Sequence, residues 1–111
     1  ETMALDDWRR VMAINVDGVF LGVKTFTTLM AESGACVVGG ASIINVSSMY
    51  GIVGAVETSA YNASKGAVRL FTKGIALEFS SKKMPIRANS RRAPSFSAAS
   101  TNSPSLETTD A

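Results

Sequence analysis

Apolar residues recur every three or four positions along two long stretches of the chain, and this spacing predicts two amphipathic helices. The first stretch covers residues 5–32 and the second covers residues 59–80. Asp6 and Asp7 favour a helix start at the first stretch, because negative charge complements the N-terminal end of the helix dipole. The apolar positions are Trp8, Val11, Met12, Val16, Val19, Phe20, Val23, Phe26 and Met30 in the first stretch, and Ala67, Val68, Phe71, Ile75 and Phe79 in the second.

The segments between and after these helices have a different pattern. An apolar run from Ala41 to Ser48 predicts a buried parallel strand. Thr58 or Ser59 is the expected N-cap of the second helix, because a hydroxyl there can accept a hydrogen bond from a free backbone N–H. Pro85 is expected to stop that helix, and residues 86–89 to begin a short strand.

Composition restricts the function classes. The chain has 111 residues, enough for one domain at most, and its net charge of +2 with 18% charged residues includes no basic stripe interleaved with aromatics, so a nucleic-acid partner is not expected. With no His and a lone Cys36, we expect no metal site and no disulfide. No apolar stretch approaches the ~18 residues that span a bilayer, so we expect a cytoplasmic protein without a membrane partner.

Tyr61 and Lys65 are the most informative pair of polar residues. A step of four residues places two side chains on one helix face, so the phenol and the ammonium can converge on one reacting atom. Ser48 ends the predicted strand, and a loop over residues 49–58 with two glycines leads from it to the helix. Because ligands of parallel sheets bind beyond the carboxyl ends of strands, these residues predict a proton-transfer site.

Each of these residues also has a purely structural interpretation. Tyr61 can be an amphipathic side chain at a helix start, Lys65 a solvated charge, and Ser48 a polar strand end. Asn15 differs, because it lies in the middle of an apolar helix face and its buried amide needs a hydrogen-bond partner. Residue type alone therefore leaves Asn15 open between a functional and a structural role.

Four blocks of sequence together resemble the short-chain dehydrogenase/reductase family, in its compact single-domain branch. They are Trp8–Val16 followed by Gly18-Val19-Phe20, then residues 42–51, residues 61–73 and residues 86–90, in the family's order. The resemblance covers roughly residues 1 to 90. It implies an NAD(P)-dependent oxidoreductase that interconverts a secondary alcohol and its ketone.

The resemblance also assigns roles to four residues. It implies that Asn15, Ser48, Tyr61 and Lys65 are catalytic, with Tyr61 as the general acid/base and Asn15 anchoring a water in the proton relay. Lys65 and Tyr61 would bind the cofactor, NAD or NADP, at its nicotinamide ribose, and Ser48 and Tyr61 would bind the substrate oxygen. Residues 48–54 look like those of alicyclic-alcohol and hydroxysteroid dehydrogenases, which indicates a cyclic substrate. The parent protein would be a homodimer or homotetramer.

The expected fold is an α/β fragment of a doubly wound, Rossmann-like parallel sheet, with two long helices, about two strands and a disordered C-terminal tail. Residues 1–90 would be the catalytic half of the domain, and the family's Gly-rich cofactor turn would precede Glu1. The segment between Asn15 and Ser48 is several residues longer than is usual in the family, so we expect a looser connection around residues 34–40.

Residues 91–111 depart from the family, because they form a tail rich in Ser, Thr, Ala and Pro that is too polar to order itself. We expect a frame change or aberrant splice near Ser90. Translation of the source nucleotides in the other two frames tests this, and the absence of a family-like C-terminus in both would contradict it. The alternative function is a catalytically dead interaction module that retains the family's subunit-interface helices.

Overall fold

The computed structural model describes residues 2–92, so most of the predicted tail, residues 93–111, lies outside the described part. Two long helical segments and a two-stranded parallel sheet make up this part, which confirms the predicted fold class. The elements are α1 (Leu5–Met12), the π-helical turn η1 (Ala13–Asp17), α2 (Gly18–Ala35), β1 (Ala41–Ser47), the 3-10 turn η2 (Met49–Gly51), α3 (Ser59–Ser81) and β2 (Ile86–Arg92).

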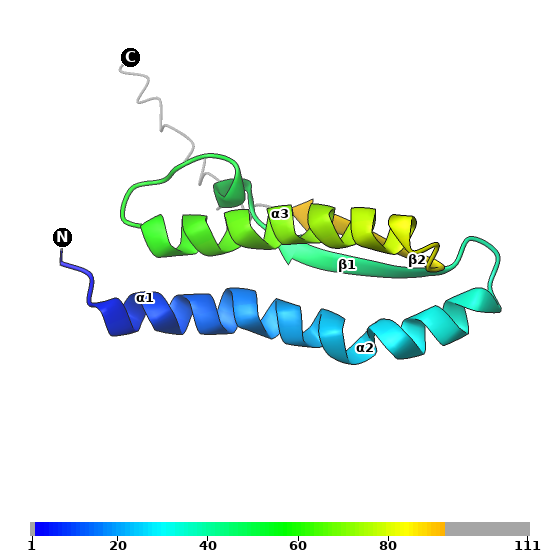
Figure 1. Cartoon of the computed structure of the whole chain (residues 1–111). Helices are drawn as coiled ribbons and strands as arrows, with labels where there is room; N and C mark the ends of the chain where they lie inside the picture. Colours follow the sequence, from blue (N-terminus) through cyan, green and yellow to red (C-terminus); the bar gives the residue numbers. More distant parts are fainter. Residues whose placement is uncertain (1, 93–111) are drawn as a thin grey trace, which may run out of the picture.

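The first predicted helix is continuous from α1 through η1 to α2, and it ends three residues beyond the predicted end at residue 32. We call this continuous helical segment, Leu5 to Ala35, the rod. Figure 1 shows the rod and α3 running alongside each other, with β1 near both. The π-helical turn at Ala13–Asp17 is not visible in the hydrophobic period, because that period does not distinguish an α-turn from a single wider turn. Asn15 lies in this turn.

The two strands pair in parallel, with Ala41 opposite Ile86 and Ser47 opposite Arg92. The parallel strand was predicted, but the expectation that it is buried holds for one face only. Ile44 and Val46 are 58% and 53% exposed, whereas their neighbours at alternate positions are partly or fully covered. Successive side chains of a strand point to opposite faces, and within residues 2–92 the helices cover only one of them.

The hydrophobic core lies near the beginning of the two strands. It is formed by Val23 of α2, Ile75 and Phe79 of α3, and Ile86 of β2, with partly buried apolar residues around them. The other end of the sheet, where Ser47 and Arg92 stand, carries polar side chains. The core therefore holds the helices and strands together at one end of the sheet, and the carboxyl ends of the strands lie outside the core.

The connection between α2 and β1 is tighter than predicted. A Cβ on Gly34 would lie 2.5 Å from the Pro85 carbonyl oxygen, and one on Gly40 would clash with the same atom. Gly40 also has a φ of +72°, which L side chains rarely adopt. The Ala41 N–H donates a hydrogen bond to Pro85 O at 2.8 Å, so both ends of this connection are held against the segment before β2.

Candidate active site

Tyr61 and Lys65 lie together on the first turns of α3. The Lys65 Nζ is 5.7 Å from the centroid of the Tyr61 ring, and the Tyr61 side chain is 38% exposed. The four-residue step therefore brings the phenol and the ammonium onto one accessible face, as the sequence indicated.

The end of β1 holds the backbone of this helix in place. The Lys65 Nζ donates to Val46 O at 3.2 Å, and the Ser47 Oγ donates to Lys65 O at 2.9 Å. Ser47 is only 3% exposed, so its hydroxyl has little access to water and depends on this partner. An ammonium has three donors, which leaves Lys65 two further N–H groups for a ligand.

Asn15 reaches Tyr61 through a buried hydroxyl. The Asn15 Nδ2 donates to Ser64 Oγ at 3.0 Å, and Ser64 Oγ donates to Tyr61 O at 2.8 Å. Ser64 is fully buried. The amide of Asn15 thus has the partner that its position requires, and the same contact links the π-helical turn to the backbone of Tyr61.

Ser48 stands next to this group but is not bonded to it. Its Oγ accepts a hydrogen bond from Tyr50 N at 3.2 Å and caps the short turn η2. The Tyr50 ring meets the Tyr61 ring edge-on, with centroids 6.4 Å apart. Within residues 2–92, no hydrogen bond joins Ser48 to Tyr61 or Lys65. The Ser48 Oγ donates no hydrogen bond to the described residues, so its O–H is available to a ligand.

The loop between β1 and α3 is held by the Asn62 side chain and by a close approach at Gly51, neither of which the sequence analysis predicted. The Asn62 Nδ2 donates to Tyr50 O at 2.7 Å and to Val53 O at 2.8 Å. A Cβ on Gly51 would lie 2.7 Å from the Lys65 carbonyl carbon and oxygen, so the loop rests directly on the helix backbone at that residue. Only a glycine allows this approach without moving the backbone.

Sequence signals do exist for three other side chains that bond across elements or support the site, namely Asn45, Ser47 and Ser64. Ser47 follows Asn45 at a step of two, so both belong to one strand face, and Ser64 lies three residues after Tyr61. Polar residues on a face that packs against another element need partners there. This rule marks Ser47, Asn45 and Ser64 as side chains that bond across elements, although it does not say to which atom.

The residues present fit one part of a nicotinamide cofactor. The Tyr61 hydroxyl and the two remaining N–H groups of Lys65 are suitable partners for ribose hydroxyls on an accessible helix face. The part of the chain that the structure describes groups no three His, Cys, Asp or Glu side chains that could hold a metal ion. No helix within residues 2–92 has the length and the apolar character of a membrane span.

Comparison with known proteins matches this chain to short-chain dehydrogenases and to alcohol dehydrogenases. A family model described as short chain dehydrogenase matches residues 1–107. The NADP-dependent (R)-specific alcohol dehydrogenase of Lentilactobacillus kefiri is 43% identical over 89 residues, which are 80% of this chain and 34% of that protein. The cyclopentanol dehydrogenase of Comamonas testosteroni is 45% identical over 85 residues, 77% of this chain and 31% of that protein.

Solved structures agree with these matches. The acetoin dehydrogenase of Enterobacter cloacae has a TM-score of 0.69 at 36% identity, over 80% of this chain and 34% of that one. The gluconate 5-dehydrogenase of Burkholderia cenocepacia J2315, in complex with NADP and tartrate, has a TM-score of 0.69 at 32% identity. The match covers 80% of this chain and 32% of that one. The chain thus spans about a third of the length of the relatives that it matches.

Proposed function

The chain belongs to the short-chain dehydrogenase family, and from this premise we propose that residues 1–90 form the catalytic half of an NAD(P)-dependent oxidoreductase. This enzyme interconverts a secondary alcohol and its ketone, with Tyr61 as general acid/base. The observation that carries the proposal is the Lys65 ammonium 5.7 Å from the centroid of an accessible Tyr61 ring. The carbonyls of both residues accept hydrogen bonds from the buried hydroxyls of Ser47 and Ser64.

The residues divide the work as follows. The Tyr61 phenolate takes the proton of the alcohol hydroxyl, and in ketone reduction the phenol returns it. The positive charge of Lys65 stabilises the phenolate, because opposite charges at short range attract. The free O–H of Ser48 donates to the substrate oxygen, as oxyanion-stabilising donors do. A nicotinamide ring, when bound, accepts or supplies the hydride.

Asn15 has two roles in this proposal. Its hydrogen bond to Ser64 holds the π-helical turn against α3, and this turn is where a water of the proton relay would be anchored. π-Helical turns within α-helices occur frequently at functional sites, which supports this placement. Asn15 would therefore contribute in two ways: through Ser64 it supports the backbone of Tyr61, and through its turn it would position the relay water.

The substrate and partner assignments extend the proposal. A cyclic alcohol is supported by relatives named as cyclopentanol dehydrogenase and as 3-alpha-(or 20-beta)-hydroxysteroid dehydrogenase. Either cofactor is compatible, since one similar structure holds NADP and another holds NADH. We further propose that the complete protein is a homodimer or homotetramer and acts in the cytoplasm.

A chimera tests the proposed activity. Residues 2–90 would replace the matching segment of the Lentilactobacillus kefiri alcohol dehydrogenase, which supplies the rest of a dehydrogenase domain. We expect NADP-dependent oxidation of a secondary alcohol, measured by absorbance of the reduced cofactor. A chimera that folds and binds NADPH but produces no turnover would contradict the catalytic role of this segment.

A second candidate function is an interaction module without catalysis, and the helix surface favours it. The rod formed by α1, η1 and α2 exposes large apolar side chains, among them Ile14 at 65%, Leu21 at 55% and Leu29 at 60%. Such a surface favours association with another apolar surface. Under this alternative the chimera is inactive, while the 111-residue chain still elutes as an oligomer in size-exclusion chromatography.

The 111-residue chain and the chimera should differ in their affinity for the cofactor. The sequence contains no G-x-G-x-x-G turn, and such a turn provides most of the anchoring of a dinucleotide. Two or three hydrogen bonds to the ribose contribute about 1 kcal/mol each, against an association cost of at least about 4 kcal/mol. We therefore expect no saturable NADH or NADPH binding to the 111-residue chain at micromolar concentration, followed by nicotinamide fluorescence. Saturable binding would show that the cofactor site is elsewhere.

A further inference from the structure

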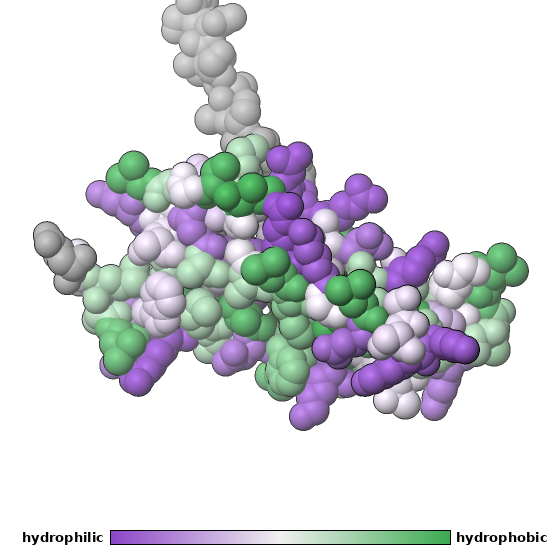
Figure 2. All heavy atoms as spheres, turned by 45° about the horizontal axis from the view of Figure 1, so that its top comes forward, coloured by the Kyte–Doolittle hydropathy of each residue, from purple (hydrophilic) through white to green (hydrophobic). Residues whose placement is uncertain are grey.

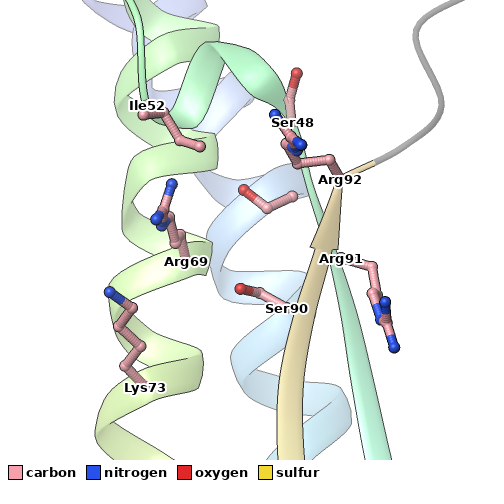
Figure 3. A pocket seen from close by; sticks show the side chains of 8 residues that line it. Ser48, Ile52, Arg69, Lys73, Ser90, Arg91 and Arg92 are labelled. Carbon is pink, nitrogen blue, oxygen red and sulfur yellow. The ribbon is translucent and has the colours of Figure 1, made fainter.

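A hollow of about 650 Å³ lies between α3 and the carboxyl ends of the two strands. Its lining contains four basic residues, three serines and one apolar side chain, and no acidic residue. The lining includes Ser48, Arg69, Lys73, Ser90, Arg91 and Arg92 (Figure 3). The hollow therefore combines positive charge with hydroxyl groups at the end of the sheet where ligands of parallel sheets bind.

The basic side chains of α3 continue the row that begins with the candidate catalytic pair. Arg69 and Lys73 follow Lys65 at steps of four residues, so they lie on the same helix face. On β2, alternation places Ser90 and Arg92 on one side and Arg91 on the other. Figure 3 shows the Ser90 hydroxyl directed towards Arg69, Arg92 beside Ser48, and the side chain of Arg91 pointing away from α3.

Among residues 2–92, no carboxylate forms a salt bridge with the basic side chains of this hollow. Within residues 2–92, the salt bridge recorded is that between Arg9 and Asp6, on α1. Arg69, Lys73 and Arg92 thus bring positive charge to one concave surface without compensation from the described part of the chain. Like charges around one hollow repel each other, and a bound anion relieves this repulsion.

We propose that this hollow binds a small anion, a carboxylate or a phosphate monoester, between Arg69 and Arg92. The planar guanidinium group presents paired donors that match the oxygen spacing of both anions, and the Ser90 hydroxyl adds a neutral donor. Ser48 belongs to this lining and also to the candidate active site. A substrate whose hydroxyl meets Ser48 would place an anionic group here. That assignment of substrate class rests on the proposed function, whereas the binding itself does not.

Isothermal titration calorimetry of the 111-residue chain tests the binding. Sodium succinate and inorganic phosphate would be titrated separately, with sodium chloride used to keep the ionic strength constant, because exposed charges respond to salt. We expect saturable binding of at least one anion. Arg69→Gln should weaken it about tenfold or more, since it removes a charge-assisted hydrogen bond. Arg69→Lys should retain part of it.

Arg10→Gln is the matched control, because it removes one positive charge from the exposed surface of α1 outside the hollow. A preference for succinate identifies a carboxylate ligand, and a preference for phosphate identifies a phosphate monoester. If circular dichroism shows that Arg69→Gln loses helix content, Arg92→Gln replaces it as the test variant and should weaken anion binding by a similar factor. Binding heats that depend only on ionic strength and not on the anion would overturn the proposal. Equal loss of anion affinity in Arg10→Gln and in Arg69→Gln or Arg92→Gln would also overturn it.

Tyr61→Phe separates this proposal from the dehydrogenase function. It removes the phenol that the oxidoreductase needs, and Tyr61 is not part of the lining. We expect unchanged anion affinity in this variant even if the chimera proves inactive. Loss of anion binding in Tyr61→Phe, with helix content intact, would place the anion elsewhere and overturn the assignment to the hollow.

Discussion

The two long helical segments of this molecule are embedded to very different degrees. In α3 the buried positions follow one another at steps of three or four residues along the whole helix, namely Ala60, Ser64, Val68, Thr72, Ile75 and Phe79. In the rod from Leu5 to Ala35 only Val23 and Gly34 are buried. Both segments have helical periodicity in sequence, so periodicity alone does not determine how much of a helix is covered.

This difference affects the candidate site directly. Tyr61 and Lys65 lie on the embedded helix, where Ser47 and Ser64 bond to their backbone carbonyls. Asn15 lies on the exposed rod and meets α3 through one side-chain hydrogen bond. Figure 2 shows hydrophobic residues at the surface of the visible face, interspersed with hydrophilic ones. The candidate acid/base pair therefore lies on the more deeply buried of the two helical segments, whereas Asn15 lies on the more exposed one.

The largest expected effect concerns catalysis. In the chimera, Tyr61→Phe should lower kcat by about 10³-fold, since general acid–base catalysis contributes about 10²–10⁴-fold, while NADPH affinity stays close to that of the parent. Asn15→Ala should lower kcat by about tenfold, because it removes the hydrogen bond to Ser64 that holds the turn of the proposed relay water. Steady-state kinetics and fluorescence titration measure both. Retention of a tenth of the parent rate in Tyr61→Phe would remove this residue from the catalytic role.

The next effect concerns packing in the two helices. Ile75→Ala should lower the free energy of unfolding by about 2–5 kcal/mol, because Ile75 is 7% exposed and its truncation leaves a cavity. Leu29→Ala, at a side chain 60% exposed, should change it by less than about 0.5 kcal/mol. Urea unfolding at one fixed protein concentration measures both. A large loss in Leu29→Ala would show that the exposed rod is covered in solution, and size-exclusion chromatography would then identify the covering copy.

A smaller effect is expected where the loop touches α3. Gly51→Ala should destabilise by about 1–3 kcal/mol, because a Cβ there would lie 2.7 Å from backbone atoms of Lys65. Gly54→Ala is the matched control, since a Cβ at Gly54 meets nothing within 4 Å. Thermal unfolding followed by circular dichroism compares the two variants. Equal midpoints would mean that the loop does not rest on the helix at Gly51.

The smallest effect concerns the hydroxyl between the two helices. Ser64→Ala should cost about 1 kcal/mol, because it removes the bond to Tyr61 O and the acceptor of the Asn15 amide. Ser33→Ala removes a comparable bond, from Ser33 Oγ to Leu29 O, at an exposed site on α2. Its effect should stay below about 0.5 kcal/mol. A Ser64→Ala variant as stable as Ser33→Ala would show that the link between the helices contributes nothing.

The sequence by itself determined the features that depend on neighbouring residues. The spacing of apolar residues placed both helices to within a few residues, and the four-residue step of Tyr61 and Lys65 placed both side chains on one face. The apolar run at Ala41 gave the right position for a parallel strand. Helical and strand periodicities arise from local backbone geometry, so they can be read without knowing what lies opposite.

Only the tertiary structure decided which partners these elements meet. The contact between Asn15 and Ser64 joins residues 49 positions apart, and that between Ser47 and Lys65 joins residues 18 apart. The π-helical turn at Asn15, the open face of β1 and the approach of Gly51 to Lys65 also depend on packing. A local pattern specifies the face that a side chain occupies, whereas the atom on the other side depends on how the elements pack, because distant segments meet only in the folded chain.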